Sequence, residues 1–472
     1  MNTLAICLTG GVLLAGVGST DPTPGNSTHN SIATTYRERA NRIIEATLAD
    51  NDAYKKLEEL CDDVGNRLSG SENLNNAIRW AVETFKRDGQ ENVHTESVMV
   101  PRWVRGRESL ELILPRRESV PMLGLGGSVG TPAEGITADV IAVYDEKELD
   151  QVGEKARGKI VLFNFPMDGH GYGTTVRFRT NGARLASEYG AVAALVRSVT
   201  TRSLQSPHTG AMRYGDAKVK IPTAAVSVEY ARKMARLLKR GKTVRVTLNM
   251  QAKTLDDAPS ANVVAELRGS ERPDEVVVIS GHLDSWDVGQ GAHDDGAGVV
   301  TAMETINILR KLDLRPRRTI RAVLWTNEEN GLAGGKAYAK RHESELSNYV
   351  AAIEMDSGGF APTGYGVSLS DEAAQNVAVE QLADVLSLLE SIGATNASAG
   401  GGGADIGPMK PAGVPMLGHR VDGEHYFDYH HTHADTLDKV DPDDMSKNAA
   451  AMAVVAYILA DMPGRLGAPS GG

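Results

Sequence analysis

The second half of the chain alternates between short apolar runs and longer stretches with helical periodicity. The apolar runs at 276–279, 320–324 and 351–355 predict buried strands, because they are short and lie between turn residues. Apolar residues recur every three to four positions in three stretches, which predict helices at 298–312, 372–390 and 445–461. Strands that alternate with helices indicate an α/β fold, in which helices flank a mixed central β-sheet.

Residues 108–255 have a different pattern. Gly- and Pro-rich turns separate short apolar or alternating runs, such as 159–163, 191–196 and 243–248. This pattern predicts a strand-rich unit with one or two helices. The preceding segment, 32–107, begins with helical periodicity. We therefore expect residues 32–107 and 256–465 to form one α/β domain, into which the strand-rich unit is inserted.

The chain begins with an apolar run, residues 1–20, that ends in small residues. Such a run is typical of a signal peptide, although the basic residues that usually precede the apolar core are missing. A short membrane anchor or a misassigned start site would give the same pattern. We expect a secreted or periplasmic protein with a linker at 21–31, where Pro, Gly, Ser and Thr predominate.

Composition excludes some functions. The net charge is −11, so the chain has no basic field to hold nucleic acid or anionic lipid. The chain has 2 cysteines, and Cys7 lies in the predicted leader, which leaves Cys61 alone in the mature protein. Neither an internal disulfide nor a cysteine-ligated metal site is then expected. Any metal must be held by His and carboxylate side chains.

His and acidic residues follow the predicted strands where the strands end. They occupy the segments 281–284, 292–296, 326–331 and 356–359, and a His-rich segment near the C-terminus at 429–436. Ligand-binding groups of open α/β sheets gather at the carboxyl ends of strands. These segments contain no Lys or Arg. Crowded carboxylates raise one another's pKa, and two divalent cations would remove that repulsion. The pattern therefore predicts a dinuclear metal site.

A count of donors supports this prediction. Zinc prefers about four ligands, drawn here from imidazole and carboxylate groups. Two His, an Asp, a Glu and one shared Asp give each of two Zn²⁺ ions three protein ligands, and a bridging water or hydroxide completes both sets. One Glu of the Glu328-Glu329 pair is then free to act as general base. Mn²⁺ or Co²⁺ could replace zinc at such a site.

The sequence resembles the M28 family of metallopeptidases at these residues. The stretch 281–298, GHLDSWDVGQGAHDDGAG, carries the match most specifically. Supporting segments are 67–71, 123–138, 206–210 and 430–436. The resemblance covers residues 32–462 and implies that the inserted unit is a protease-associated (PA) domain. It also implies a homodimer.

The resemblance assigns roles by motif position. It implies that the metal ligands are His282, Asp294, Glu329, Asp356 and His431. Asp294 would bridge the metals, one of which is also bound by Glu329 and His431 and the other by His282 and Asp356. Glu328 would be the general base, and Asp284 would fix the orientation of the His282 imidazole. A cis peptide is implied between Asp294 and Asp295.

Other residues near these motifs have weaker assignments. The spacing to Asp435 and Thr436 selects His431 over His430 and His433. Asp405 is a candidate contact for the free amine of the substrate or a turn residue, and His419 a candidate stabiliser of the oxyanion. His293 is expected to be a bystander and Asp295 a support that bonds the backbone. Trp286 and Asp287 line the pocket or only pack.

These features predict a di-zinc exopeptidase whose substrates are dipeptides with free amino and carboxyl ends, or short peptides. A broader aminopeptidase acting on longer peptides would use the same metal site with a more open pocket. A catalytically silent binding protein would normally lack one of the ligands or the general base. A glutaminyl cyclase would bind a single zinc and would lack the inserted domain.

Overall fold

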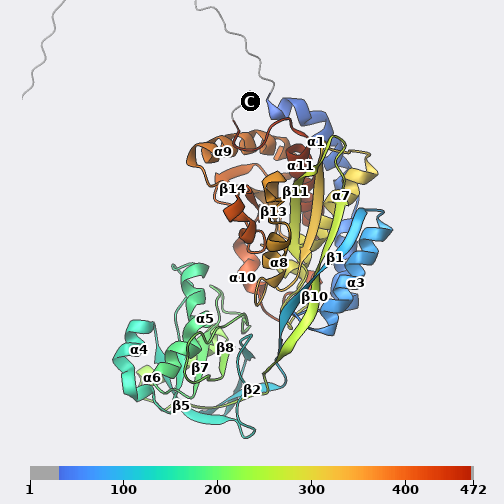
Figure 1. Cartoon of the computed structure of the whole chain (residues 1–472). Helices are drawn as coiled ribbons and strands as arrows, with labels where there is room; N and C mark the ends of the chain where they lie inside the picture. Colours follow the sequence, from blue (N-terminus) through green and yellow to red (C-terminus); the bar gives the residue numbers. More distant parts are fainter. Residues whose placement is uncertain (1–30, 469–472) are drawn as a thin grey trace, which may run out of the picture.

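The computed structural model describes residues 31–468, so the predicted leader (1–20) and nearly all of the predicted linker (21–31) lie outside the described residues. The strands form two eight-stranded sheets. Their orders are β1-β10-β12-β11-β13-β16-β14-β15 and β3-β2-β9-β5-β6-β7-β8-β4. Figure 1 shows the second sheet at the far end of the long strands β1 and β10. We call residues 108–250, which carry the second sheet, the inserted unit, and the rest the main domain.

The centre of the main sheet is parallel. β11 (Arg272–His282) lies between β12 (Arg318–Trp325) and β13 (Tyr349–Glu354) and runs parallel to both. β16 (Met416–Val421) continues the parallel block. β10 (Lys253–Leu267) and β14 (Pro362–Ser368) pair with this block in the antiparallel direction. β1 (Glu91–Val104) and β15 (Asn396–Ala399) form the two edges. The predicted mixed α/β sheet is thus confirmed.

Helices cover both faces of this sheet because alternate residues of its strands point to opposite faces. Val277 and Ile279 of β11 belong to a core shared with the helices on one face, whereas Val276 and Val278 belong to a second core with Tyr338 of α8. The first face carries α1 (Ile32–Leu48), α2 (Asp52–Glu58), α3 (Glu72–Arg87), α7 (Ala297–Lys311), α9 (Glu372–Leu386) and α11 (Pro442–Asp461). The second carries α8 (Ala333–Arg341).

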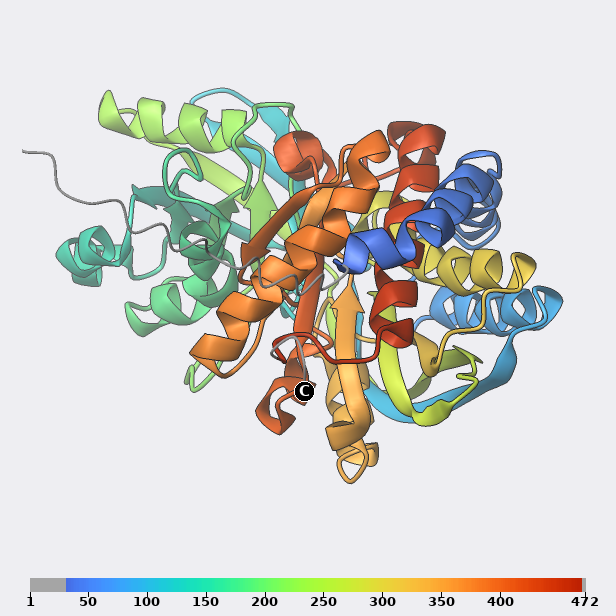
Figure 2. The ribbon, with the colours of Figure 1, turned by 90° about the horizontal axis from the view of Figure 1, so that it is seen from above.

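Seen from above, α1, α3, α7 and α11 lie on the side of the main sheet away from the inserted unit (Figure 2). None of the helices in residues 31–468 is long and apolar enough to cross a membrane.

The inserted unit contains three α-helices rather than the one or two expected. They are α4 (Glu146–Val152), α5 (Tyr172–Glu188) and α6 (Val228–Lys239). Its strands are β2 (Glu108–Leu114), β3 (Glu118–Val120), β4 (Met122–Gly124), β5 (Ile136–Val143), β6 (Ile160–Phe163), β7 (Ala193–Arg197), β8 (Thr223–Val226) and β9 (Arg245–Met250). Helix α5 projects from this unit toward α10 (Tyr426–Tyr429) of the main domain (Figure 1). This projection brings the inserted unit to the predicted site.

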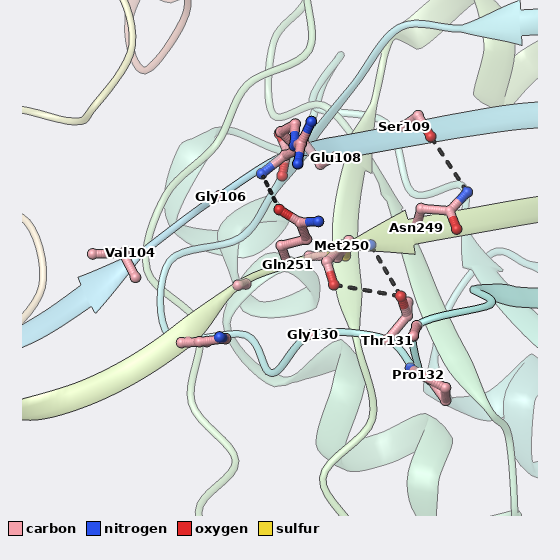
Figure 3. Close-up of a pocket in the computed structure, with 14 residues that line it drawn as sticks. Val104, Gly106, Glu108, Ser109, Gly130, Thr131, Pro132, Asn249, Met250 and Gln251 are labelled. Carbon is pink, nitrogen blue, oxygen red and sulfur yellow. Dashed lines mark hydrogen bonds between the residues drawn. The ribbon is translucent and has the colours of Figure 1, made fainter.

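The two parts of the molecule join where β1 passes into β2 and β9 passes into β10. A hollow of about 720 Å³ opens at this junction, and Figure 3 shows its lining. The bonds across it are structural: the Gln251 side chain accepts from the amide of Arg107, and Thr131 accepts from the amide of Met250. The residues that line it include no His, and its carboxylate, Glu108, already accepts from the Gly124 amide. The predicted chemistry therefore lies elsewhere.

Candidate active site

The five predicted ligands meet at the carboxyl ends of the parallel strands. β11 ends at His282, Asp356 follows β13, and Glu329 lies in the loop after β12. Asp294 precedes α7, and the peptide between Asp294 and Asp295 is cis, which confirms that prediction. His431 comes from the loop after α10. The parallel strands thus bring together residues that lie up to 149 positions apart in the sequence, from 282 to 431.

Asp294 lies between the two His. Its Oδ1 is 3.2 Å from Nε2 of His282, and its Oδ2 is 3.2 Å from Nε2 of His431. Asp356 approaches the first imidazole, with Oδ1 3.5 Å from Nε2 of His282. Glu329 approaches the second, with Oε2 3.1 Å from Nε2 of His431. The side chains therefore divide into two groups of three that share Asp294.

Several atoms of this cluster have no hydrogen-bond partner among the described residues. They are His282 Nε2, Asp294 Oδ2 and Glu329 Oε1, and all three are buried. Buried polar atoms in proteins are nearly always bonded, so orphan atoms that converge on one point call for a missing partner. His282, Asp294 and Glu329 each offer one ligand atom, and these three atoms lie within 4.8 Å of one another. This arrangement fits a bound cation.

The electrostatics of the cluster favour the same conclusion. Burial and the neighbouring carboxylate of Asp294 raise the pKa of Glu329 to about 7. Burial likewise raises the pKa of Asp356, and the charge of Asp294 raises it further. These carboxylates repel one another when they are ionised in a site with little water. Divalent cations would stabilise the ionised forms.

Glu328 lies beside the ligand set and borders open space. It is half-buried and lines a pocket of about 350 Å³ together with Asp294, Glu329 and Asp356. Burial raises its pKa well above the ordinary value for a glutamate. A carboxylate with a raised pKa next to a pocket can accept a proton from water and release it again.

Asp284 contacts the His282 imidazole through its backbone. It is the backbone carbonyl of Asp284 that accepts from Nδ1 of His282, at 2.8 Å. The carboxylate instead accepts from the backbone amide of Glu328, at 3.0 Å, and from that of Glu329, at 3.4 Å. Ser69 also donates to this carboxylate. Asp284 therefore contacts the imidazole through its backbone carbonyl, and its carboxylate holds the loop of the Glu pair.

Arg67 explains why the segment 67–71 accompanies the site. Its fully buried guanidinium donates to the backbone carbonyls of Leu283, Gln290 and Gly291. These carbonyls belong to the loop between β11 and Asp294. One side chain thus fixes the loop that carries the first ligand and precedes the bridging carboxylate.

The inserted unit contributes one wall of the catalytic pocket, which the sequence did not reveal. Nδ1 of His431 lies 3.2 Å from the backbone carbonyl of Thr209, and the amide of Thr209 donates to the carbonyl of His431. Tyr172 and Arg179 of α5 line the pocket, as do Tyr426, Phe427 and His430 of the main domain. A second hollow, of about 280 Å³, is also lined by Glu328 and Glu329 and by residues of both parts of the molecule.

The neighbouring His residues differ in their surroundings. The His430 ring stacks on that of His431, with centroids 3.6 Å apart, and lines the pocket, so it lies nearer the chemistry than the motif spacing indicated. His293 stacks on Phe360 and accepts from the amide of Gly359, which is a packing role. His433 is exposed and lines a different hollow.

The residues next to the ligands are structural in character. Asp295 accepts from the amides of His282 and Gly298, as expected for a backbone support. Trp286 is buried and its ring lies 5.6 Å from that of His431. Asp287 pairs with Arg105.

Asp405 and His419 are fully or almost fully buried and do not line the pocket. The amide of Asp405 donates to Glu354, whereas neither oxygen of its carboxylate has a partner among the described residues. His419 bonds Tyr365 and Asn448. The geometry therefore gives no support to the two substrate contacts predicted at these positions.

Comparison with known proteins places this site in a family. The chain belongs to peptidase family M28, whose family model matches residues 262–456. It is a peptidase of the metal-dependent exopeptidase class. It is 45% identical to carboxypeptidase Q of Mus musculus over 430 residues, which cover 90% of this chain and 90% of that protein. It is also 45% identical to carboxypeptidase Q of Homo sapiens over 414 residues, with 88% and 86% covered.

Solved structures agree on the fold. A peptidase M28 precursor from Shewanella amazonensis superposes with a TM-score of 0.86 at 35% identity, over 92% of this chain and 98% of that one. An aminopeptidase from Aneurinibacillus superposes with a TM-score of 0.62 at 21% identity, over 90% of this chain and 97% of that one. The second likeness concerns the fold alone. The resemblance to M28 that the motifs indicated is thus confirmed.

Proposed function

We propose that this protein is a di-zinc exopeptidase that hydrolyses the peptide bond of dipeptides or short peptides. The observation that carries the proposal is the position of Asp294, whose two oxygens each face a different imidazole. A carboxylate that bonds one partner would need only one of these contacts. Two contacts on opposite oxygens are what a carboxylate that bridges two metals requires.

The residues present fit two zinc ions. His282 and Asp356 would hold one ion, Glu329 and His431 the other, and Asp294 both. Zinc takes imidazole and carboxylate ligands of this kind, and Mn²⁺ or Co²⁺ could take its place. Each ligand imidazole has its second nitrogen next to a backbone carbonyl, that of Asp284 or of Thr209, which fixes the ring for coordination through Nε2.

Glu328 has the position of a general base. Bound zinc ions would supply an acidified water and polarise the scissile carbonyl. The Glu328 carboxylate then takes a proton from the attacking water and passes it to the departing amine. Asp284 positions this group by holding its backbone amide. The raised pKa of Glu328 suits both halves of this transfer.

Short substrates are favoured by the shape of the site. The pocket of about 350 Å³ is near the lower end of the range for small-molecule sites. The inserted unit, which we infer to be a PA domain, forms its second wall through Tyr172 and Arg179. The alternative is an aminopeptidase for longer peptides, and leucine aminopeptidase 2 of Trichophyton equinum is 27% identical over 58% of this chain.

One experiment separates these two activities. Release of the N-terminal residue from a dipeptide and from the tripeptide extended at its C-terminus is measured under identical conditions with zinc-loaded enzyme. The proposal predicts a kcat/KM at least about tenfold higher for the dipeptide, because a third residue has to pass the wall of the inserted unit. Equal or faster cleavage of the tripeptide would establish the aminopeptidase instead.

We also propose that the protein is exported and forms a homodimer. Export is supported by the apolar run at 1–20. The dimer is supported only by the resemblance to the family. Mass measurement of the exported protein under native conditions tests both proposals together.

A further inference from the structure

Arg179 is a buried cation in the wall of the catalytic pocket. It lies on α5 of the inserted unit and is 7% exposed. Its guanidinium donates to the Tyr172 hydroxyl, at 2.9 Å, and to the carbonyl of Thr209, at 3.4 Å. One terminal nitrogen also lies 3.3 Å from Nδ1 of His431. Its Nε is buried and has no partner among the described residues.

No carboxylate of residues 31–468 forms an ion pair with this guanidinium. Arg318, which is also buried, is paired with Glu275, and the fully buried Arg67 is bonded by the backbone carbonyls of Leu283, Gln290 and Gly291, whereas Arg179 has neither a carboxylate nor a full set of carbonyls. An unpaired buried charge is costly, so it persists where something else compensates for it. The metal centre cannot provide that compensation, because cations bound next to His431 would repel the guanidinium. The missing partner is therefore an anion that enters the pocket.

We propose that Arg179 binds the free α-carboxylate of the substrate and thereby determines specificity for dipeptides. The inference rests on the proposed peptidase function and adds to it the residue that recognises the C-terminus. A guanidinium can bond a carboxylate through two parallel N–H groups, and Arg179 is one of the residues that line the pocket. Tyr172 holds the group in place, since its ring stacks on Phe427 with centroids 5.2 Å apart.

The position of Arg179 also limits substrate length. Its guanidinium touches the imidazole of His431, a metal ligand in the proposed site. Consecutive residues are about 3.8 Å apart, so about one residue fits between a carbonyl at the metals and a carboxylate on Arg179. A substrate with two residues after the scissile bond would place its carboxylate beyond this contact.

Two other Arg residues compete for the same role. Arg102 and Arg213 line the second hollow, which shares the Glu pair with the catalytic pocket. Both are exposed to solvent. Hydrated side chains on a surface gain little from an additional partner, in contrast to a desolvated guanidinium. The buried residue is the stronger anchor.

The test compares a dipeptide that has a free carboxylate with the same dipeptide as its C-terminal amide. Wild-type enzyme and the R179M, R179K and R177M variants are assayed on both, and zinc per chain is measured for each. Arg177 is the matched control, because it lies on the same helix, is exposed and pairs with Glu146. R179K retains the positive charge but lacks the planar guanidinium with its paired N–H donors. It replaces R179M in the comparison if R179M folds poorly.

The expected result is a loss of selectivity. Wild-type and R177M enzymes should prefer the free acid by about 10- to 100-fold in kcat/KM, the range of one charge-assisted bond. R179M should lose that preference, with the acid slowed and the amide changed less than about twofold, and R179K should fall between. Zinc content should stay the same in all four proteins.

Other outcomes overturn the inference. If R179M lowers kcat/KM equally for both substrates or loses zinc, Arg179 supports His431 and does not bind the substrate carboxylate. If an R213M variant, assayed in the same way, loses the preference and R179M does not, the anchor lies in the second hollow. Wild-type enzyme that cleaves the acid and the amide equally well overturns this inference alone, whereas enzyme that cleaves neither overturns the proposed function.

Discussion

The catalytic pocket has two walls of opposite character. The main domain supplies carboxylates at the ends of a parallel sheet, among them Asp294, Glu328 and Glu329. The inserted unit supplies a helix with Arg179 and Tyr172 and a loop whose Thr209 carbonyl faces His431. The acidic wall is suited to hold cations and move protons, and the basic wall to bind the end of a substrate. In the mechanism that we propose, reaction and selectivity are carried by separate parts of the chain, so each can be changed without the other.

The acidic wall can be tested by removing its proposed base. Glu328→Gln keeps the shape of the side chain and removes its ability to accept a proton. We expect kcat to fall by about 10²- to 10⁴-fold, the usual contribution of a general base, while zinc content stays near that of the wild type. Steady-state kinetics on a dipeptide and elemental analysis check the two statements. A variant that stays fully active would remove Glu328 from the mechanism.

The contact between the two walls can be tested at Gly126. A Cβ atom at this position would lie 2.0 Å from the buried ring of Trp286, which in turn lies near His431. Gly126→Ala should therefore displace the inserted unit or Trp286 and lower kcat/KM by about tenfold, in line with the cost of overpacking. Gly173→Ala, where the new Cβ meets nothing within 4 Å, is the control. Equal activity of the two variants would show that the contact between Gly126 and Trp286 can shift without an effect on catalysis.

The smallest expected effect concerns a residue that lies in neither wall. Burial lowers the pKa of His419 to about 4 from 6.5, so below pH 6.5 the unfolded chain binds a proton that the folded chain does not. The stability that this His contributes is complete above pH 6.5 and is lost as the pH falls toward 4. At pH 5 the loss is about 2 kcal/mol relative to pH 8.

Urea denaturation at pH 8 and pH 5 measures this loss. The His419→Gln variant should lose less stability between the two pH values than the wild type does, by about that amount. The same loss in both proteins would show that His419 is not responsible.

Sequence patterns predicted the acidic wall better than the basic one, for a physical reason. The strand around Val277 is buried on both faces and therefore reads as an uninterrupted apolar run, and His282 follows directly at its end. Ligands at strand ends could be located in this way. The edge strand β1 of the same sheet was not predicted. Most of its residues are partly or fully exposed, and Pro101 interrupts the pattern.

Arg179 and Tyr172 had no local signal at all. They lie on a helix more than 100 positions before the first proposed ligand, and only the packing of the inserted unit against the main domain brings them to the pocket. The atom through which Asp284 contacts His282 also had no local signal. Whether its carbonyl or its carboxylate meets His282 depends on the path of the loop, which Arg67 fixes from elsewhere in the chain.

The central claim is that Asp294 joins two metals in one site, and a metal titration tests it most directly. Metal-free enzyme is titrated with Zn²⁺ while dipeptidase activity and bound zinc are followed together, with Asp294→Asn as the comparison. The account predicts that activity reaches its plateau at two zinc ions per chain and that the variant retains fewer. Full activity at one zinc ion per chain, or an unchanged titration for the variant, would contradict it.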